Sequence, residues 1–172
     1  MHRVTLALLL LLAACSAPEP PPAAGFRDGA GPIYSNAVYD PGRITGDWVQ
    51  VAAFASGEGP SCAPGRVQVG GSAGALTGAG TLCLDGERLA FSGALAPAGP
   101  GRVRPASAEG VLAQDWWLLW VDADYRTLVV GTPSGAFGFI LDRSGSLPAD
   151  RMTAAREVLD WNGYDLSRLK GF

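Results

Sequence analysis

The feature that most constrains the fold is a series of short apolar runs separated by turn residues. Each run is rich in β-branched or aromatic residues and is bounded by Gly, Pro, Asp or Ser, a pattern typical of strands. Asp85-Gly86 predicts a two-residue hairpin. Short, closely spaced strands favour an all-β fold, an eight-stranded antiparallel up-and-down β-barrel. The expected strands span residues 46–54, 66–69, 76–84, 88–95, 102–104, 115–121, 127–131 and 136–141.

One helical stretch follows the strands. It begins near Pro148, which suits the first turn of a helix, and ends at Asn162-Gly163, a typical helix stop. Three residues at helical spacing form one apolar face: Met152, Ala155 and Leu159. A single C-terminal α-helix packed outside the barrel is therefore expected, and repeated βαβ units are not.

The first residues read as an export signal. Arg3 is followed by an apolar run over residues 4–12, which is shorter than the roughly 20 residues needed to span a bilayer. Leu12-Ala13-Ala14-Cys15 resembles the lipobox of bacterial lipoproteins, in which the Cys is lipidated; a plain signal peptide with an incidental Cys is the alternative. We expect a signal peptide at 1–14, a lipid-anchored Pro/Ala-rich tether at 15–33 and a barrel domain at 34–172.

Two cysteines remain after Cys15. In an exported chain an even pair predicts a disulfide between Cys62 and Cys83, although two buried free thiols would give the same count. No zinc site is expected, because the sequence's one His lies in the signal and two Cys cannot fill four ligand positions.

Charge and composition exclude several function classes. The chain has 172 residues and a formal net charge of -3, with no basic run, so nucleic acid is not an expected partner. Without His, no Ser-His or Cys-His dyad can form. Asp122 and Asp124 could form a catalytic or metal-binding pair, but they fit a turn in which Asp bonds its own backbone. We expect no enzyme activity and no cofactor.

Three separated motifs resemble those of the lipocalin family. They are Gly46-x-Trp48, the segment 120–125 with its Asp-and-Tyr turn, and Phe139-Ile-Leu-Asp-Arg143. The tail at 163–169 is similar to the end of bacterial outer-membrane lipocalins and their apolipoprotein-D-like relatives. The resemblance implies structural roles for Gly46, Trp48, Asp122, Tyr125 and Arg143. It also implies that Trp48 and Arg143 pack together and close one end of the barrel.

The resemblance also suggests which residues contact a ligand. It places aromatic residues of the second and third motifs in the pocket, and strand parity then adds their neighbours on the same face. The expected inward residues are Trp117, Leu119, Phe137, Phe139 and Leu141. Residues 56–105 are unusually rich in Gly, Ala and Pro and depart from the family, so the shape of the cavity is left open.

The expected function is binding, storage or transport of a small apolar ligand of the fatty acid or lysophospholipid class. The protein would be attached to the outer membrane through Cys15, with its barrel facing the periplasm. An eight-stranded barrel can also be filled by its own side chains. The alternative is therefore a structural or partner-binding envelope lipoprotein.

The lipobox yields a direct prediction. Cys15→Ser removes the acceptor of the lipid and should release the protein into the soluble periplasmic fraction, because the acyl chains supply the anchor. Cell fractionation and immunoblotting measure the distribution. A variant that sediments with membranes as the parent does would contradict the lipoprotein interpretation.

Overall fold

The computed structural model describes residues 25–29 and 31–172. The predicted signal peptide, the lipidation at Cys15 and most of the tether lie outside these residues. Within the described chain, no helix is both long and apolar enough to cross a membrane.

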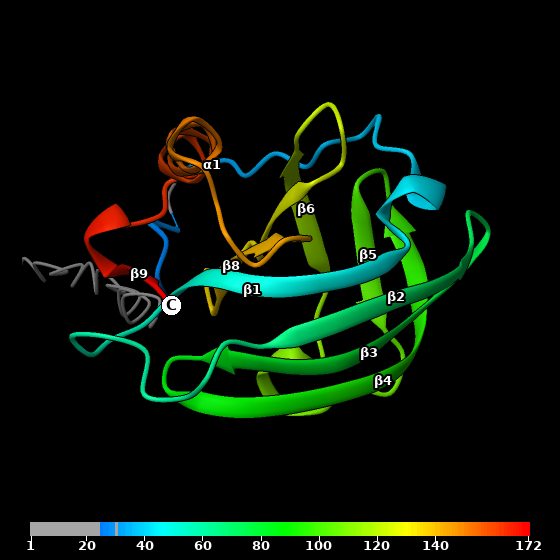
Figure 1. The fold of residues 1–172 in the computed structure, drawn as a ribbon, viewed down its shortest axis with the longest axis horizontal. Coiled ribbons are helices and arrows are strands. Elements are labelled where there is room, and N and C mark those ends of the chain that lie inside the picture. Colours follow the sequence, from blue (N-terminus) through cyan, green and yellow to red (C-terminus); the bar gives the residue numbers. More distant parts are fainter. Residues whose placement is uncertain (1–24, 30) are drawn as a thin grey trace, which may run out of the picture.

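The chain forms one antiparallel barrel, with a helix against its outer side (Figure 1). Strands follow one another around the barrel in chain order, and pairing of the first strand with the second and the eighth closes it. This confirms the expected eight-stranded up-and-down barrel. The strands are β1 Gly46–Phe54, β2 Arg66–Ser72, β3 Ala75–Leu84, β4 Glu87–Gly99, β5 Arg102–Pro105, β6 Trp116–Val121, β7 Thr127–Gly131 and β8 Gly138–Asp142.

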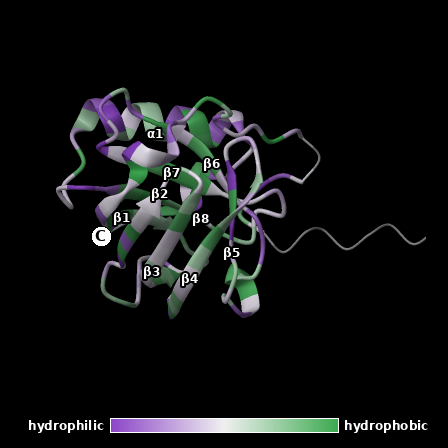
Figure 2. Ribbon diagram, turned by 90° about the vertical axis from the view of Figure 1, so that its right-hand side faces the viewer, coloured by the Kyte–Doolittle hydropathy of each residue, from purple (hydrophilic) through white to green (hydrophobic). Residues whose placement is uncertain are grey.

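Helix α1 (Ala149–Trp161) follows the barrel, as predicted. Ala155 and Leu159 are fully buried, and Met152 packs beside them, so the predicted apolar face is the one that meets the strands. Polar and apolar residues share the surface of α1 (Figure 2). A three-residue strand, β9 (Leu169–Gly171), was not predicted; it pairs with the end of β1 beyond the barrel ring.

Among the described residues, three short 3-10 helices complete the fold. They are η1 Pro41–Ile44, η2 Gly110–Leu112 and η3 Leu166–Arg168. The turns β2–β3, β4–β5 and β6–β7 lie at the same end of the barrel as η1, which we call the closed end. The loops β1–β2, β3–β4, β5–β6 and β7–β8 lie at the opposite end, which we call the mouth.

The β3–β4 hairpin has the predicted turn. Asp85 has φ 47° and Gly86 has φ 83°, the two positive φ angles that a tight two-residue hairpin requires. The Asp85 carboxylate accepts hydrogen bonds from the backbone N–H and the hydroxyl of Ser56 at 2.6 and 3.1 Å. This turn therefore also fixes the start of the β1–β2 loop.

A disulfide joins Cys62 in the β1–β2 loop to Cys83 in β3, with a Cα–Cα distance of 5.8 Å, which confirms the predicted pairing. Gln50 of β1 lies beside it and is 1% exposed. Its side-chain oxygen accepts from the backbone N–H groups of Gly65 and Cys83, and its amide donates to the carbonyl of Cys83 at 2.8 Å. One buried amide thus links three segments at the mouth.

The disulfide leads to a stability prediction. Replacing both cysteines, Cys62→Ala with Cys83→Ala, should lower the free energy of unfolding by about 3 kcal/mol, because the unfolded chain gains the entropy of an open loop. Urea denaturation with and without reductant measures the effect. Reductant should destabilise the parent and leave the double variant unchanged; equal stability of the two oxidised proteins would contradict the prediction.

Candidate functional site

The barrel interior is the first candidate site, and its lining is entirely apolar. Six of the eight barrel strands contribute side chains to it, and Trp116 and Phe139 are the largest from the second half of the chain. The cavity between them is only about 30 Å³, roughly the volume of one water molecule. The lining consists of Ile44, Val67, Val69, Phe91, Leu95, Val103, Trp116, Leu118, Leu128, Val130, Phe139 and Leu141.

Trp116 fills the centre of the interior. Its ring packs edge-to-face on Phe91, Phe137 and Phe139, with centroid distances of 4.9, 5.8 and 5.7 Å. Such pairs contribute about 0.5–1.5 kcal/mol each beyond burial of area. The indole N–H donates to the carbonyl of Leu112 at 3.1 Å. Trp116 is therefore held by three rings and by the loop that crosses the mouth.

That loop closes the mouth. Leu112, at the end of η2, is 2% exposed and belongs to the interior cluster. Together with the Trp116 hydrogen bond, it holds the β5–β6 loop against the barrel. In this conformation the interior is closed at the end where its loops are longest.

The expected orientation of β6 was wrong. The structure turns Trp116 and Leu118 inward, whereas Trp117 and Leu119 belong to the outer cluster beside α1. The guanidinium of Arg102 covers the ring of Trp117 at 4.3 Å. Trp117 and Leu119 are therefore packed on the outer side of β6.

β6 also contains a β-bulge beyond Leu118. Leu118 pairs with Val130 and Trp120 pairs with the next residue, Val129, so Leu119 is an extra residue in β6. Leu119 and Trp120 then lie on the same outer side, and counting by alternation across them reverses the faces. Residues 116–119 alternate regularly, so the bulge did not misplace Trp117; the resemblance assigned its face, and parity then placed Leu119 with it.

The third motif has the expected orientation. Phe137, Phe139 and Leu141 are at most 3% exposed and belong to the interior cluster. Between them, Ile140 belongs to the outer cluster, as alternation requires. The structure thus brings three of the five predicted residues to the lumen; their contact with a ligand stays a prediction.

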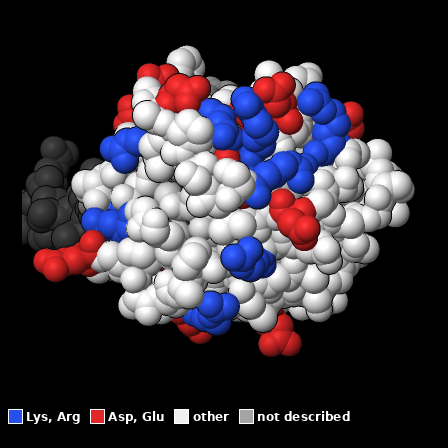
Figure 3. Space-filling view, in the orientation of Figure 1, with Lys and Arg blue, Asp and Glu red and all other residues white. Residues whose placement is uncertain are grey.

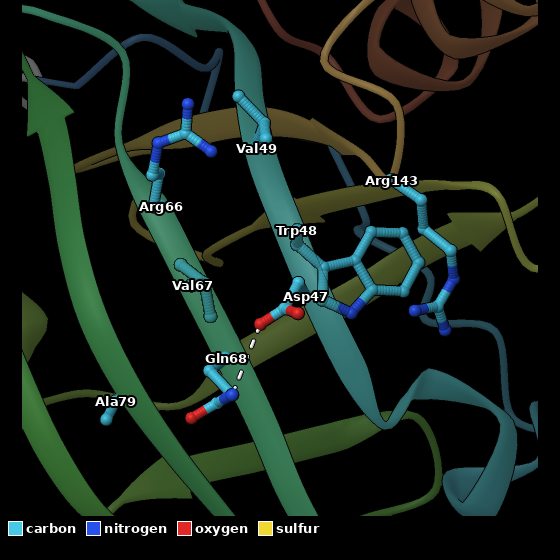
Figure 4. Close-up of a pocket in the computed structure, with 8 residues that line it drawn as sticks. All are labelled: Asp47, Trp48, Val49, Arg66, Val67, Gln68, Ala79 and Arg143. Atoms are coloured by element: carbon cyan, nitrogen blue, oxygen red, sulfur yellow. Dashed lines mark hydrogen bonds between the residues drawn. The ribbon is translucent and has the colours of Figure 1, made fainter.

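The closed end contains the predicted pair of Trp48 and Arg143 (Figure 4). The Arg143 guanidinium carbon lies 4.1 Å from the centre of the Trp48 ring, which confirms the expected contact. Arg143 also donates to the carbonyls of Tyr125, Arg43 and Thr45 at 2.7–2.9 Å. One side chain thus joins the end of β8, the β6–β7 turn and η1.

The second motif forms the β6–β7 turn. Asp122 accepts from the backbone N–H groups of Arg126 and Thr127, both at 2.6 Å, as expected for a turn Asp. Burial opposes ionisation of Asp122, but these hydrogen bonds and Arg126 outweigh it and lower the pKa of the carboxyl. Tyr125 adopts φ 58°, and its ring lies under Arg43 at 3.9 Å.

A buried ion pair near the start of α1 was missed by sequence reasoning. Asp142 is fully buried, and one of its carboxylate oxygens accepts from Arg151 at 2.6 Å and from the Thr127 hydroxyl at 2.8 Å. Burial disfavours the charge, yet hydrogen bonds from Ser144 and Thr127 and the charge of Arg151 lower the pKa of Asp142. The pair fixes α1 to β7 and β8. The sequence signal for this pair was Asp142 at the end of the third motif, followed by Arg151 within the predicted helix.

The outer surface offers a more polar pocket. It measures about 410 Å³ and lies where β1 and β2 meet Arg143 (Figure 4). Asp47 and Gln68, on neighbouring strands, are hydrogen bonded across it at 3.2 Å. Basic and acidic side chains lie side by side on the face drawn in Figure 3. This mixture of charges does not suit an apolar ligand.

Comparisons with known proteins agree with this geometry. A sequence model described as a lipocalin-like domain matches residues 103–171. Temperature-induced lipocalin-1 of Arabidopsis thaliana is 33% identical over 55 residues; the match covers 32% of this chain and 30% of the plant protein. The chain is therefore matched to less than a third of that relative's length.

Solved structures share the fold at low sequence identity. Lobster apocrustacyanin A1 is 19% identical, with a TM-score of 0.52 over 75% of this chain and 76% of its own. Insecticyanin from the tobacco hornworm Manduca sexta is 14% identical, with a TM-score of 0.57 over 82% and 84%. The chain therefore has the lipocalin fold, a closed eight-stranded barrel with one helix outside. Residues 103–171 are thus similar to lipocalin-like domains, and the fold of the chain is that of the solved lipocalin-type structures.

The closed end provides a stability prediction. Arg143→Ala should lower the free energy of unfolding by about 2–4 kcal/mol, because it removes the contact with Trp48 and leaves a cavity and unpaired carbonyls. Thermal unfolding and tryptophan emission measure the loss. Arg104→Ala is the matched control, since Arg104 is 58% exposed in its ion pair with Asp115 and should change stability by less than about 1 kcal/mol. Equal losses in the two variants would contradict the structural role.

Proposed function

We propose that this chain binds a small apolar ligand, of the fatty acid or lysophospholipid class, inside its barrel while attached to the outer membrane through Cys15. Lipocalins generally bind small hydrophobic molecules and are generally not enzymes. The observation that carries the proposal is the lumen, whose lining contains no polar side chain. A hydrocarbon chain would meet apolar surface on every side there.

Binding requires side chains to move, because a cavity of about 30 Å³ cannot hold such a ligand. Leu112 and Trp116 are the groups that must leave, since they close the mouth and fill the centre. About ten buried methylenes supply about 8 kcal/mol, the free energy of micromolar binding, before the costs of binding are subtracted. The displacement of two packed side chains is one such cost, so we expect modest affinity.

The same small cavity favours a second candidate function. If the aromatic side chains stay in place, the barrel is a solid scaffold, and the protein is a structural or partner-binding envelope lipoprotein. Native mass spectrometry of the purified protein separates the two. A bound lipid mass supports the ligand-binding function, and ligand-free protein after addition of fatty acid supports the scaffold.

A brominated long-chain fatty acid tests the site of binding, since bromine quenches tryptophan emission on contact. In the parent, ligand in the lumen should quench Trp116. Trp116→Phe should remove most of this quenching without weakening binding, because the smaller ring leaves less packed volume for the ligand to displace. Fluorescence titration gives both quantities.

Trp117→Phe is the matched control, because Trp117 lies on the outer side of β6 beneath Arg102. It should keep both the quenching and the affinity. Quenching that disappears only in Trp161→Phe would instead place the ligand on the outer surface, where Trp161 is 79% exposed. Absence of any quenching would contradict binding in the lumen.

A further inference from the structure

A pocket on the outside of the barrel lies between α1 and β6, and we call it the helix pocket. It measures about 420 Å³, which is within the range of small-molecule sites. One face of α1 forms its first wall, through Ala154, Glu157, Val158 and Trp161. These four positions have helical spacing, and their face differs from the one that packs on the strands. Trp161 is 79% exposed there.

Strand β6 forms the second wall of the helix pocket. Leu119 and Trp120 both line it, because the bulge beyond Leu118 places these two consecutive residues on the same outer side. In a regular strand one of the two would face the lumen. The bulge therefore adds an aromatic side chain to the outer surface that α1 faces.

The segment before η1 forms the third wall and is fixed at two points. The backbone N–H of Tyr34 donates to the side-chain oxygen of Asn162, just past the end of α1, at 2.7 Å. The backbone N–H of Asn36 donates to the carbonyl of Leu118 in β6 at 2.7 Å. The segment thus runs from α1 to β6 (Figure 1). The side chain of Tyr34, which is 57% exposed, lines the pocket.

Three aromatic side chains and one carboxylate give the helix pocket its chemical character. Tyr34, Trp120 and Trp161 line it, and of its nine lining residues only Glu157 is charged. Within residues 25–29 and 31–172, Glu157 makes no ion pair. The last turn of α1 contains no basic side chain. The pocket therefore combines electron-rich rings with a negative charge that no neighbouring cation balances by direct contact.

Arg27 lies near the same end of α1 but is engaged elsewhere. Its guanidinium donates to the carbonyls of Asn162 and Pro133 at 2.6 and 3.0 Å. Arg27 is 6% exposed and is not among the residues that line the pocket. Its charge is therefore held beneath the surface, away from the opening where a ligand enters.

We propose that the helix pocket binds a small organic cation with a quaternary or tertiary ammonium group. Aromatic rings attract a cation that lies over their faces, and the carboxylate of Glu157 balances its charge. A quaternary ammonium group donates no hydrogen bond, so it suits a pocket in which the side chain of Asn162 already bonds Tyr34 and Val158. This site is independent of ligand binding in the lumen.

The test compares choline with 3,3-dimethylbutan-1-ol, a neutral molecule of the same shape. In heteronuclear NMR spectra choline should shift the indole N–H signals of Trp120 and Trp161. The signals of Trp48 and Trp116 should not move, because both side chains belong to the interior cluster. Choline should bind severalfold more tightly than the alcohol, since only choline carries the charge. No shift of the two outer signals, or equal affinity for the two molecules, would overturn the proposal.

Trp161→Leu tests the aromatic wall. It should weaken choline binding about fivefold, which corresponds to about 1 kcal/mol for one cation–π contact. The fold should not change, because Trp161 is 79% exposed. Phe172→Leu is the matched control, since Phe172 is an exposed aromatic residue outside the pocket, and it should bind choline as the parent does. Equal binding by the parent and Trp161→Leu would also overturn the proposal.

Glu157→Gln tests the charge. It should weaken choline binding severalfold and leave binding of the neutral alcohol unchanged. Asp160→Asn removes a carboxylate from the same end of α1 but outside the lining of the pocket, so it should have a smaller effect. Equal losses in the two variants would show that the general field of the helix end attracts the cation, and would contradict a site built around Glu157.

Vesicles distinguish a free cation from a lipid headgroup, since phosphatidylcholine carries the same trimethylammonium group as choline. The Cys15→Ser chain is used, so that no acyl anchor contributes. Sedimentation with phosphatidylcholine vesicles that is lost in Trp161→Leu would support the site with a headgroup as its ligand. Choline binding without sedimentation would support the site with a free cation. Equal sedimentation with phosphatidylglycerol vesicles would show insertion of the exposed rings into the bilayer and would contradict recognition of the headgroup.

Discussion

Strand β1 closes the barrel by pairing with β2 along one edge and with β8 along the other. A closed sheet has no free edge at which another chain could add. β1 also pairs with β9, beyond a bend at the register shift between Gln50 and Ala52. Before the bend Trp48 lies inside the barrel, and after it Ala52 and Phe54 belong to the outer cluster beside α1. The path of β1 therefore determines how the closed end is sealed, where the lumen lies and where α1 packs.

The fold was largely predictable because its signals are local. The Asp85-Gly86 turn, the helix face at Ala155 and Leu159, and the alternation through Phe139 each depend on neighbouring residues. The contact between Trp48 and Arg143 is not local, and it was expected only from the resemblance. The sequence contains both residues but nothing in their spacing that brings them together.

The site was less predictable, for two physical reasons. Apolar residues occupy both faces of β6 from Trp116 to Leu119, so polarity gives no sign of which face lines the lumen. The closing of the lumen depends on the rotamers of Trp116 and the position of Leu112, which residue types do not specify. Gln50 illustrates the same limit, since a polar residue in an apolar strand signals burial with partners but does not name them.

A pocket of about 250 Å³ lies at the closed end, bordered by the β2–β3 and β4–β5 hairpins, and it differs from the lumen in what a ligand must displace. In the lumen, a ligand can bury its apolar surface only after packed side chains have moved, so the lumen is poorly preorganised for binding. At the closed end the space is present beforehand, but its small size limits the apolar area that a ligand can bury. Leu95 and Val103 form the boundary between the two spaces, which makes them the positions where a change in side-chain volume would affect both.

The pairing of β1 with β8 and β9 also bears on how the chain folds. Ala52 pairs with Ile140 and with Gly171, so the strand made first completes its hydrogen bonds with strands made last. Contacts of such long sequence separation slow folding, because the entropy of a long loop is lost before they form. The hairpins from β2 to β5 can form while β1 still has an open edge. Strand β9 is thus required for the second half of β1 to become protected along this edge.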